Sequence, residues 1–323
     1  MRAAVYLRYG PPEMLRICDI AKPRPAADEI LVRIRCSTVN RTDVGFLRAK
    51  PFLTRFWSGL TRPRHTTLGC EFAGEIEAVG DAVTRFAVGE RVFGFDDVGW
   101  GGHAEYKVIA QDRSVATIPD GITDEQAAAS TEGAHYALVG IRAAKVAEGD
   151  RVLVHGATGA IGSAAVQLLR HAGAYVLATS TTRNVELVDS LGADEVVDWE
   201  RADFTASGER FDLVFDAVGK SSFGACKPLL VDRGVYVSTD LGPRAQNPFL
   251  GLASPLFARM GAKRVLFPIP SHDQAMIETL RDLLAGGAFV PVVDRVYPLA
   301  EIVDAFEYVE TGQKTGNVVI RVS

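Results

Sequence analysis

The sequence has little of several features that mark particular classes of protein. Its 323 residues include four cysteines, and the formal net charge is only −5. None of the cysteines is spaced Cys-x-x-Cys, which argues against a disulfide framework and favours a reduced, cytoplasmic compartment. The small negative charge gives no electrostatic reason to expect nucleic acid or an anionic membrane as a partner. No apolar run has the length of a membrane span or the position of a signal peptide.

The length predicts two domains, since a domain usually holds about 150 residues. Hydrophobic residues make up 47% of the chain and charged residues 23%, so cores of ordinary size can be buried. We place one domain, which is rich in strands, at residues 1–122 plus 287–323. The other, an α/β domain at residues 123–286, is inserted between these two pieces.

The strand-rich domain is predicted from short apolar runs separated by proline- and glycine-containing turns. These runs lie at residues 3–6, 29–35, 74–79, 91–93 and 104–109, with further strands expected at 290–297 and 317–322. Their irregular spacing favours a partly open barrel over a parallel sheet.

A glycine-rich turn in the middle of the chain organises the α/β domain. The apolar run 151–155 predicts a buried strand, and the pattern around residues 163–170 predicts a helix. Between them stand Gly156, Gly159, Ala160, Ile161 and Gly162. Such glycines allow the backbone to approach a pyrophosphate, which the N–H groups at a helix start can bind. Because the spacing is Gly-x-x-Gly-x-x-Gly, a tight turn without a ligand remains the alternative.

Strand-like and helix-like segments alternate after this turn. The strands are expected at 174–180, 194–198, 211–219, 234–239 and 265–267. This alternation predicts a doubly wound parallel sheet with right-handed crossovers. Ligands of such sheets bind at the carboxyl ends of the strands, so Ala217, Val218 and Leu241 are predicted to face a bound dinucleotide.

The residues after the second strand indicate which dinucleotide binds. An NAD site usually carries a carboxylate there for the ribose 2′-hydroxyl, whereas this chain has none before Glu186. Ser180 and Thr181 can donate hydrogen bonds to a 2′-phosphate, and Arg183 can form a bidentate contact with it. The sequence therefore favours NADP(H), with a solvated Arg183 as the alternative.

Three polar residues and one aromatic segment stand out in the strand-rich domain. Asn40 and Asp43 follow a strand, and Glu71 lies between small residues before another. Each can line a cleft, or act locally as a helix cap or a solvated turn residue. The segment 46–60 mixes four aromatic side chains with basic ones. We interpret it as a flap over an apolar pocket or a partner contact, rather than a membrane or nucleic-acid surface.

Taken together, these motifs resemble the medium-chain dehydrogenase/reductase superfamily, in its zinc-free quinone oxidoreductase-like branch. The resemblance covers essentially the whole chain. Its markers are Val39-Asn-Arg-Thr-Asp43, Gly69-Cys-Glu-Phe-Ala-Gly74, Val88-Gly-Glu-Arg-Val-Phe93, the glycine turn, Ser190-Leu-Gly-Ala-Asp194, Phe211–Gly219 and Thr315-Gly-Asn-Val-Val-Ile320. The fold that this implies is a Rossmann domain inserted into a GroES-like catalytic domain, with the active site between the two.

The resemblance also implies roles for single residues. Asn40 would lie near the nicotinamide and the substrate oxygen, Ala160 and Ile161 at the pyrophosphate, and Leu241 and Asn317 at the nicotinamide end. Trp199 stands where many relatives have a tyrosine near the adenosine phosphate, so only stacking carries over. Asn317 stands where lysine is common, which weakens that contact.

The resemblance bears on metal binding too. Zinc-dependent relatives carry a cysteine where Asn40 stands, a histidine where Cys70 stands, and a cysteine or an acid near Glu132. Cys70 with Glu71 or Glu132 remain conceivable ligands, but Asn40 is a poor one, and no pair of the six histidines has ligand spacing. We therefore predict no metal. Without a metal to polarise a simple ketone, the acceptor must already be electrophilic.

The predicted function is therefore transfer of a hydride from NADPH to a quinone or an α,β-unsaturated carbonyl. The alternative is an NADP(H)-binding, redox-responsive partner or scaffold protein with little turnover. A homodimer that pairs near Val265 is what the resemblance implies.

Overall fold

The computed structural model describes residues 1–206, 208–242, 246–259, 263–268 and 273–323. The chain forms two compact units, one of residues 1–132 with 271–323 and one of residues 133–270. The predicted boundaries at 122/123 and 286/287 differ from this division. Helix α3 (Asp124–Ala128) belongs to the first unit because it packs on strands β3 and β4, and α9 (Gln274–Ala285) because it packs on β7.

The first unit is built on a seven-stranded sheet with the strand order β14-β15-β3-β4-β5-β7, and β6 also pairs with β3. The strands of this unit are β1 (Arg2–Val5), β2 (Arg16–Asp19), β3 (Glu29–Val39), β4 (Glu71–Val79), β5 (Arg91–Phe95), β6 (Tyr106–Ala110), β7 (Val115–Thr117), β14 (Val293–Pro298) and β15 (Asn317–Arg321). Its other helices are α1 (Arg41–Arg48), α2 (Arg55–Ser58) and α10 (Ile302–Glu310). Strand β3 is the hub of the sheet, because it pairs with β15, β4 and β6.

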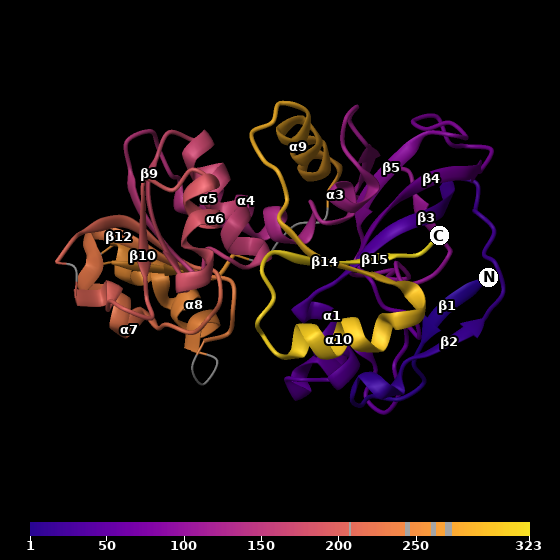
Figure 1. Ribbon diagram of the computed structural model, residues 1–323, viewed down its shortest axis with the longest axis horizontal. Helices are drawn as coiled ribbons and strands as arrows, with labels where there is room; N and C mark the ends of the chain where they lie inside the picture. The colour runs from indigo at the N-terminus through magenta and orange to yellow at the C-terminus, as the bar shows by residue number, and fades with distance from the viewer. Residues whose placement is uncertain (207, 243–245, 260–262, 269–272) are drawn as a thin grey trace. The chain divides into compact units, whose positions relative to one another are not determined.

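Segments from both parts of the chain complete this sheet. Strand β15 runs antiparallel to β3 and parallel to β14, so it lies between them (Figure 1). Its side chains Val318, Val319 and Ile320 are fully buried. The predicted return of the chain to the strand-rich domain is confirmed.

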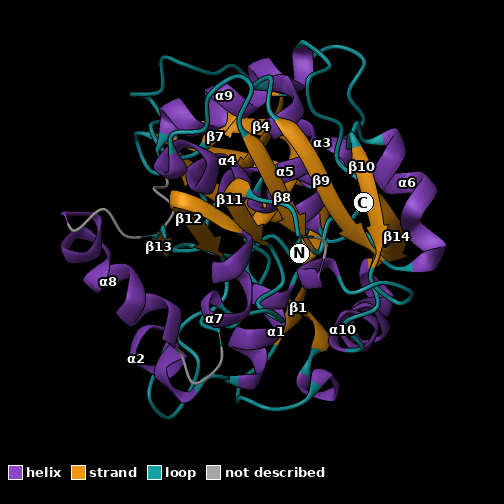
Figure 2. Ribbon diagram, turned by 90° about the vertical axis from the view of Figure 1, so that its left-hand side faces the viewer, coloured by secondary structure: helices purple, strands orange, loops and turns teal. Residues whose placement is uncertain are grey.

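The second unit holds a six-stranded sheet in which every pairing is parallel, with the order β10-β9-β8-β11-β12-β13 (Figure 2). Its strands are β8 (Arg151–His155), β9 (Tyr175–Ser180), β10 (Glu195–Asp198), β11 (Phe211–Asp216), β12 (Leu230–Ser238) and β13 (Arg264–Leu266). Its helices are α4 (Glu132–Ala144), α5 (Ala160–His171), α6 (Val185–Ser190), α7 (Phe223–Cys226) and α8 (Gln246–Arg259). The order is that of a doubly wound Rossmann sheet, as predicted.

Several elements were not predicted, and for three of them the reason is visible. All four residues of β2 are exposed, so no apolar pattern marks that strand. Strand β7 has only three residues. Helix α8 contains two prolines and a glycine, which usually interrupt helices. Among the described residues, no helix is long and apolar enough to cross a membrane.

Candidate active site

The glycine turn of the second unit connects β8 to α5 in a shape that two of its glycines require. Gly156 has a φ of +84°, which side-chain-bearing residues rarely adopt. A Cβ on Gly162 would lie 2.1 Å from the carbonyl oxygen of Gly156. The N-cap of α5 is Gly159, which supplies no side chain to the first N–H groups of the helix. The predicted pyrophosphate residues, Ala160 and Ile161, begin this helix, so the turn fits an anion.

Two predicted cofactor residues lie directly against this turn. The backbone N–H of Ala217 donates to the carbonyl of His155 at 3.0 Å. The side chain of Val218 packs on Gly156 so closely that a Cβ there would meet it at 2.3 Å. Leu241 follows the neighbouring strand β12, and its carbonyl accepts from the backbone N–H of Asn247. All three lie past the carboxyl ends of strands, where the sequence predicted them.

The end of β9 differs in detail from the expectation. Ser180 is only 1% exposed, and its hydroxyl donates to the carbonyl of Thr181 at 3.0 Å. Thr181 is partly exposed and Arg183 is exposed, in the short turn that follows. Of the three residues predicted to bind the 2′-phosphate, Thr181 and Arg183 are therefore the ones that a ligand can reach.

Two carboxylates that sequence reasoning missed lie beside these residues. The Thr182 hydroxyl donates to Asp198 at 2.6 Å, and its backbone N–H donates to Glu200 at 2.9 Å. Both acids come from the end of β10, where Asp198 stands opposite Ser180 in the parallel ladder. The signal was present in the sequence, because neighbouring strands of a parallel sheet end at the same edge.

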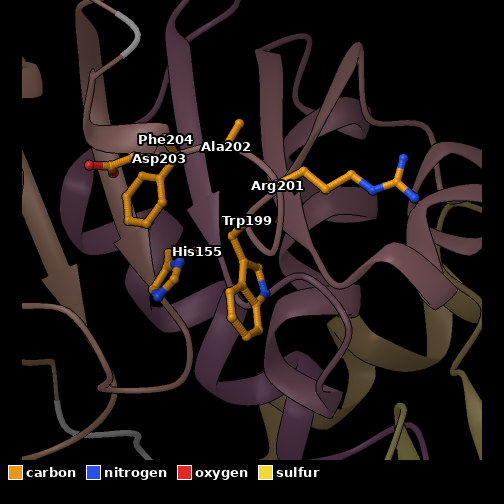
Figure 3. Close-up of a pocket in the computed structure, with 6 residues that line it drawn as sticks. All are labelled: His155, Trp199, Arg201, Ala202, Asp203 and Phe204. Carbon is orange, nitrogen blue, oxygen red and sulfur yellow. The ribbon is translucent and has the colours of Figure 1, made fainter.

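A pocket of about 320 Å³ opens at this edge of the sheet (Figure 3). Its lining residues are His155, Trp199, Arg201, Ala202, Asp203 and Phe204. The rings of His155 and Phe204 stack with centroids 4.7 Å apart, and burial lowers the pKa of His155. Trp199 is 47% exposed, and the side chain of Arg201 extends away from these rings. The flat rings of His155, Trp199 and Phe204 suit a planar base.

The first unit contains a buried polar cluster centred on Glu71, the first residue of β4. One carboxylate oxygen of Glu71 accepts from the Thr131 N–H at 3.2 Å, the Thr131 hydroxyl at 2.6 Å and the Glu132 N–H at 2.5 Å. The other accepts from the Asn40 side-chain amide at 2.5 Å and from the Thr38 hydroxyl. Five donors surround one carboxylate. The solvated-turn alternative for Glu71 is therefore wrong.

Asn40 and Asp43 form the cap of α1. The backbone N–H of Asn40 donates to Asp43 Oδ2 at 2.8 Å, as in a capping box. Asp43 Oδ1 accepts from the Gly69 N–H at 2.9 Å, which ties the start of the helix to the loop before β4. The local role expected for these residues is confirmed, and it fixes the backbone from which the Asn40 side chain projects.

The Asn40 side chain connects the cluster to a lysine that sequence reasoning missed. Its Nδ2 donates to Glu71 Oε2 and to Thr38 Oγ1. Its Oδ1 faces Lys314 Nζ at 3.4 Å, and the same ammonium donates to the carbonyl of Gly316 at 2.5 Å. Lys314 directly precedes the motif Thr315–Ile320, but nothing in the sequence pattern distinguishes it from a solvated lysine.

Burial sets the protonation of the neighbouring groups. Loss of solvation, with the adjacent charge of Glu71, raises the pKa of Glu132 to about 8. Burial also raises the pKa of Asp43 to about 7, and that of the Cys70 thiol well above its ordinary value. Near neutral pH, Glu132 and Cys70 therefore hold their protons.

These groups do not fit a zinc ion. Zinc needs three protein ligands of thiolate, imidazole or carboxylate type in an open tetrahedron. Here Asn40 points N–H donors at Glu71, Cys70 is a thiol with Sγ 3.9 Å from Glu132 Oε2, and an ammonium stands beside them. Within the described ranges, no group of three His, Cys, Asp or Glu residues is placed to hold a metal.

Two further predicted features lie in the first unit. Asn317 is the first residue of β15 and is 2% exposed. Its Nδ2 donates to the carbonyl of Val292, and its Oδ1 is a buried acceptor with no hydrogen-bond partner. In the segment 46–60, Phe46 packs against Trp100 with centroids 4.5 Å apart, whereas Phe52, Phe56 and Trp57 are well exposed, at 64%, 58% and 70%.

Two family profiles match the chain. The profile described as alcohol dehydrogenase GroES-like domain matches residues 26–120, and the one described as zinc-binding dehydrogenase matches residues 191–320. The chloroplastic quinone-oxidoreductase homolog of Spinacia oleracea is 31% identical to this chain, and the match covers 99% of the chain and 98% of the relative. The 2-methylene-furan-3-one reductase of Solanum lycopersicum is 30% identical over 99% of the chain and 79% of that protein.

A solved structure has the same fold. The quinone oxidoreductase from Coxiella burnetii matches with a TM-score of 0.88 at 24% identity, over 100% of this chain and 99% of that one. The two sheets, the glycine turn and the similar proteins all indicate the same superfamily. The chain belongs to the medium-chain dehydrogenase/reductase superfamily, in its quinone-oxidoreductase-like branch.

Proposed function

We propose that this protein is an NADPH-dependent oxidoreductase that reduces quinones or α,β-unsaturated carbonyl compounds without zinc. The observation that carries the proposal is the set of groups around Asn40. It consists of the Asn40 amide, the Lys314 ammonium and the Glu71 carboxylate, whose oxygens already accept five hydrogen bonds. The profile that matches residues 191–320 is described as zinc-binding dehydrogenase, but neither the amide of Asn40 nor the ammonium of Lys314 is a zinc ligand.

The second unit offers a site for each part of NADP(H). The turn from Gly156 to Gly162 would hold the pyrophosphate, and the pocket beside Trp199 the adenine. Thr181 and Arg183 would hold the 2′-phosphate. Asp198 and Glu200 oppose a phosphate there, so the preference for NADPH depends on the charge of Arg183.

The nicotinamide end of the cofactor has candidate contacts as well. The backbone around Ala217, Val218 and Leu241 would lie beside it, and the unpaired Oδ1 of Asn317 could accept from its carboxamide. When bound, NADPH supplies a hydride, and the protein supplies orientation and electrostatics.

The groups around Asn40 include no Lewis acid, and this limits the class of molecule that can accept the hydride. A simple ketone needs strong polarisation before it accepts a hydride, whereas quinones and enones are already electrophilic. The names of the two plant relatives agree with this class, since a 2-methylene-furan-3-one carries a C=C bond conjugated to a ketone. The pairing of homodimer subunits along the β13 edge, near Val265, belongs to the same proposal, because β13 pairs only with β12 among the described strands.

The direct test is oxidation of NADPH in the presence of simple quinones and enones, before and after treatment with a metal chelator. We expect turnover that the chelator leaves unchanged, with NADH a poorer donor. Loss of activity with the chelator would overturn zinc independence. Tight NADPH binding with no turnover across the panel would favour the redox-responsive partner protein instead.

The choice between NADPH and NADH is tested by Arg183→Ala. A lost charge-assisted contact should weaken NADPH binding by about 1.5–3 kcal/mol and leave NADH binding nearly unchanged. Arg201→Ala is the matched control, because Arg201 lines the same pocket but extends away from its rings. Fluorescence titration measures both cofactors. Equal losses for NADPH and NADH would contradict the assignment.

A further inference from the structure

The polar cluster of the first unit contains a cation at the place where sequence reasoning expected only Asn40. We propose that Lys314 Nζ donates a hydrogen bond to the carbonyl oxygen of the quinone or enone and so stabilises the negative charge that develops there. This inference rests on the proposed function. In this proposal Asn40 and Glu71 are positioning residues for Lys314.

The hydrogen bonds of Asn40 exclude it as the donor to a substrate. A side-chain amide has two N–H groups, and both are used, one toward Glu71 Oε2 at 2.5 Å and one toward Thr38 Oγ1 at 3.2 Å. The remaining Oδ1 is an acceptor and faces Lys314 Nζ. Asn40 can therefore hold an ammonium in place, but it has no N–H left for an oxygen of a ligand.

Lys314 has donor capacity to spare. An ammonium carries three N–H groups, and two protein acceptors lie within hydrogen-bond distance, Asn40 Oδ1 at 3.4 Å and the Gly316 carbonyl at 2.5 Å. The longer of the two is a weak bond. Lys314 is partly buried, whereas Glu71 is fully buried, and among the described residues no acceptor is hydrogen-bonded to the third N–H of the ammonium.

Acidic groups near Lys314 oppose the effect of its burial. The charged and titratable groups that face it are Glu71, Glu132, Asp294 and Arg41. Burial lowers the pKa of Lys314, and the negative charges of Glu71 and Asp294 oppose this. A cation in an enclosed site with few competing waters interacts strongly with a nearby oxyanion.

The chemistry balances with groups that are present. When a hydride adds to the carbon β to a carbonyl, its electron pair forms the new C–H bond. The C=C electron pair then shifts, and the carbonyl oxygen becomes negative. The Lys314 ammonium donates its hydrogen bond to that oxygen and passes it a proton, which gives an enol. In the case of a quinone, this enol then tautomerises to the hydroquinone, as the β carbon loses a proton and the second carbonyl oxygen gains one. The neutral amine takes a proton back from water.

The test compares Lys314→Met with Lys314→Arg and with Lys145→Met, which removes an exposed lysine of the second unit. We expect Lys314→Met to lower kcat/KM for a quinone by about 100- to 1,000-fold, as for loss of an oxyanion donor. NADPH binding should change less than about twofold, and Lys314→Arg should restore part of the activity. Lys145→Met should match the unchanged protein.

A second readout does not depend on turnover. The anion of 4-nitrophenol mimics the oxyanion, and its visible absorption reports its ionisation when it is titrated with and without NADP⁺. The unchanged protein should bind the anion at least about tenfold more tightly than Lys314→Met does. Equal binding by the two folded proteins, checked by circular dichroism, would overturn the proposal. If Lys314→Met does not fold, Lys314→Gln replaces it in the same comparison.

The same titration separates this inference from the proposed function. A protein that turns over no quinone or enone, but binds the anion through Lys314, would contradict the proposed function alone. A protein that turns over quinones equally well with and without Lys314 would contradict this inference alone.

Discussion

Glu71 accepts hydrogen bonds on both carboxylate oxygens from five donors, so at this residue an amide is not equivalent to an acid. Glu71→Gln would turn an NH₂ group toward donors whichever way it rotates. We expect the free energy of unfolding to fall by about 2–4 kcal/mol, because buried donors lose their acceptor. Urea denaturation measures this. Glu132→Gln is the matched control, and an equal loss in both variants would contradict the specific role of Glu71.

Glu132 makes the stability of the protein depend on pH. Its pKa rises from an ordinary 4.5 to about 8 in the folded chain, because it is buried beside Glu71. Between these values the folded chain holds a proton that the unfolded chain has released, so stability falls as the pH rises. Glu132→Gln removes this proton and should gain about 1–3 kcal/mol relative to the unchanged protein at pH 9, but little at pH 4.

Unfolding of both proteins across pH 4–9 checks this expectation. Asp43, whose pKa is raised to about 7 by burial, adds a similar fall to both proteins and therefore cancels in the difference. Parallel pH curves for the two proteins would show that Glu132 is ionised in the folded chain.

At the scale of single residues, the sequence indicated which residues belong to a site more readily than it indicated which residues they contact. Asn40, Asp43 and Glu71 were identified because they stand at strand ends and in motifs. Lys314 was missed because no period or spacing ties it to Asn40, which is 274 residues away along the chain. Asp198 was missed although both strands were predicted, because only their pairing in the sheet brings it opposite Ser180.

Two glycines in the connection from β8 to α5, Gly162 and Gly159, are expected to serve different purposes, one in the fold and one in ligand binding. A Cβ on Gly162 would lie 2.1 Å from a backbone oxygen, whereas one on Gly159 meets nothing closer than 3.9 Å. Gly162→Ala should therefore destabilise the protein by about 1–3 kcal/mol. Gly159→Ala should change its stability by less than about 0.5 kcal/mol, yet weaken NADPH binding if a pyrophosphate lies against the turn.

Thermal unfolding and NADPH titration of both variants separate these effects. Undiminished NADPH binding by Gly159→Ala would place the pyrophosphate elsewhere.

At the scale of helices and strands, the sequence was most informative for elements with strong local signals. The side chains of Thr123 and Gln126 form a capping box at the start of α3, a motif that the sequence displays, whereas α8 lacks such a signal.

The two units differ in how the chain builds them. Residues 133–270 form the second unit from one continuous segment, while the first unit needs β14 and β15 beside β3. We expect residues 133–270, produced alone, to fold and to bind NADPH. Residues 1–132 alone should not fold, since buried β3 would lose its partner β15. Circular dichroism and NADPH titration check both fragments. A folded 1–132 fragment would contradict the role given to β15.

The architecture of the whole molecule was predictable because alternation of strands and helices allows few topologies. The division between units was harder to place. Helices α3 and α9 adjoin the Rossmann segment in sequence, but their apolar faces pack on strands of the other unit. Such packing depends on contacts between distant segments, which a single sequence does not display.

The position of β15 has a consequence for biosynthesis. A ribosome releases the whole of residues 133–270 before it releases residues 317–321. The Rossmann unit can therefore fold while the chain is still being made, whereas the sheet that carries Asn40 and Glu71 must wait with residues 36–39 of β3 without their partner strand β15. During that interval the exposed end of β3 is the part that a chaperone would need to shield.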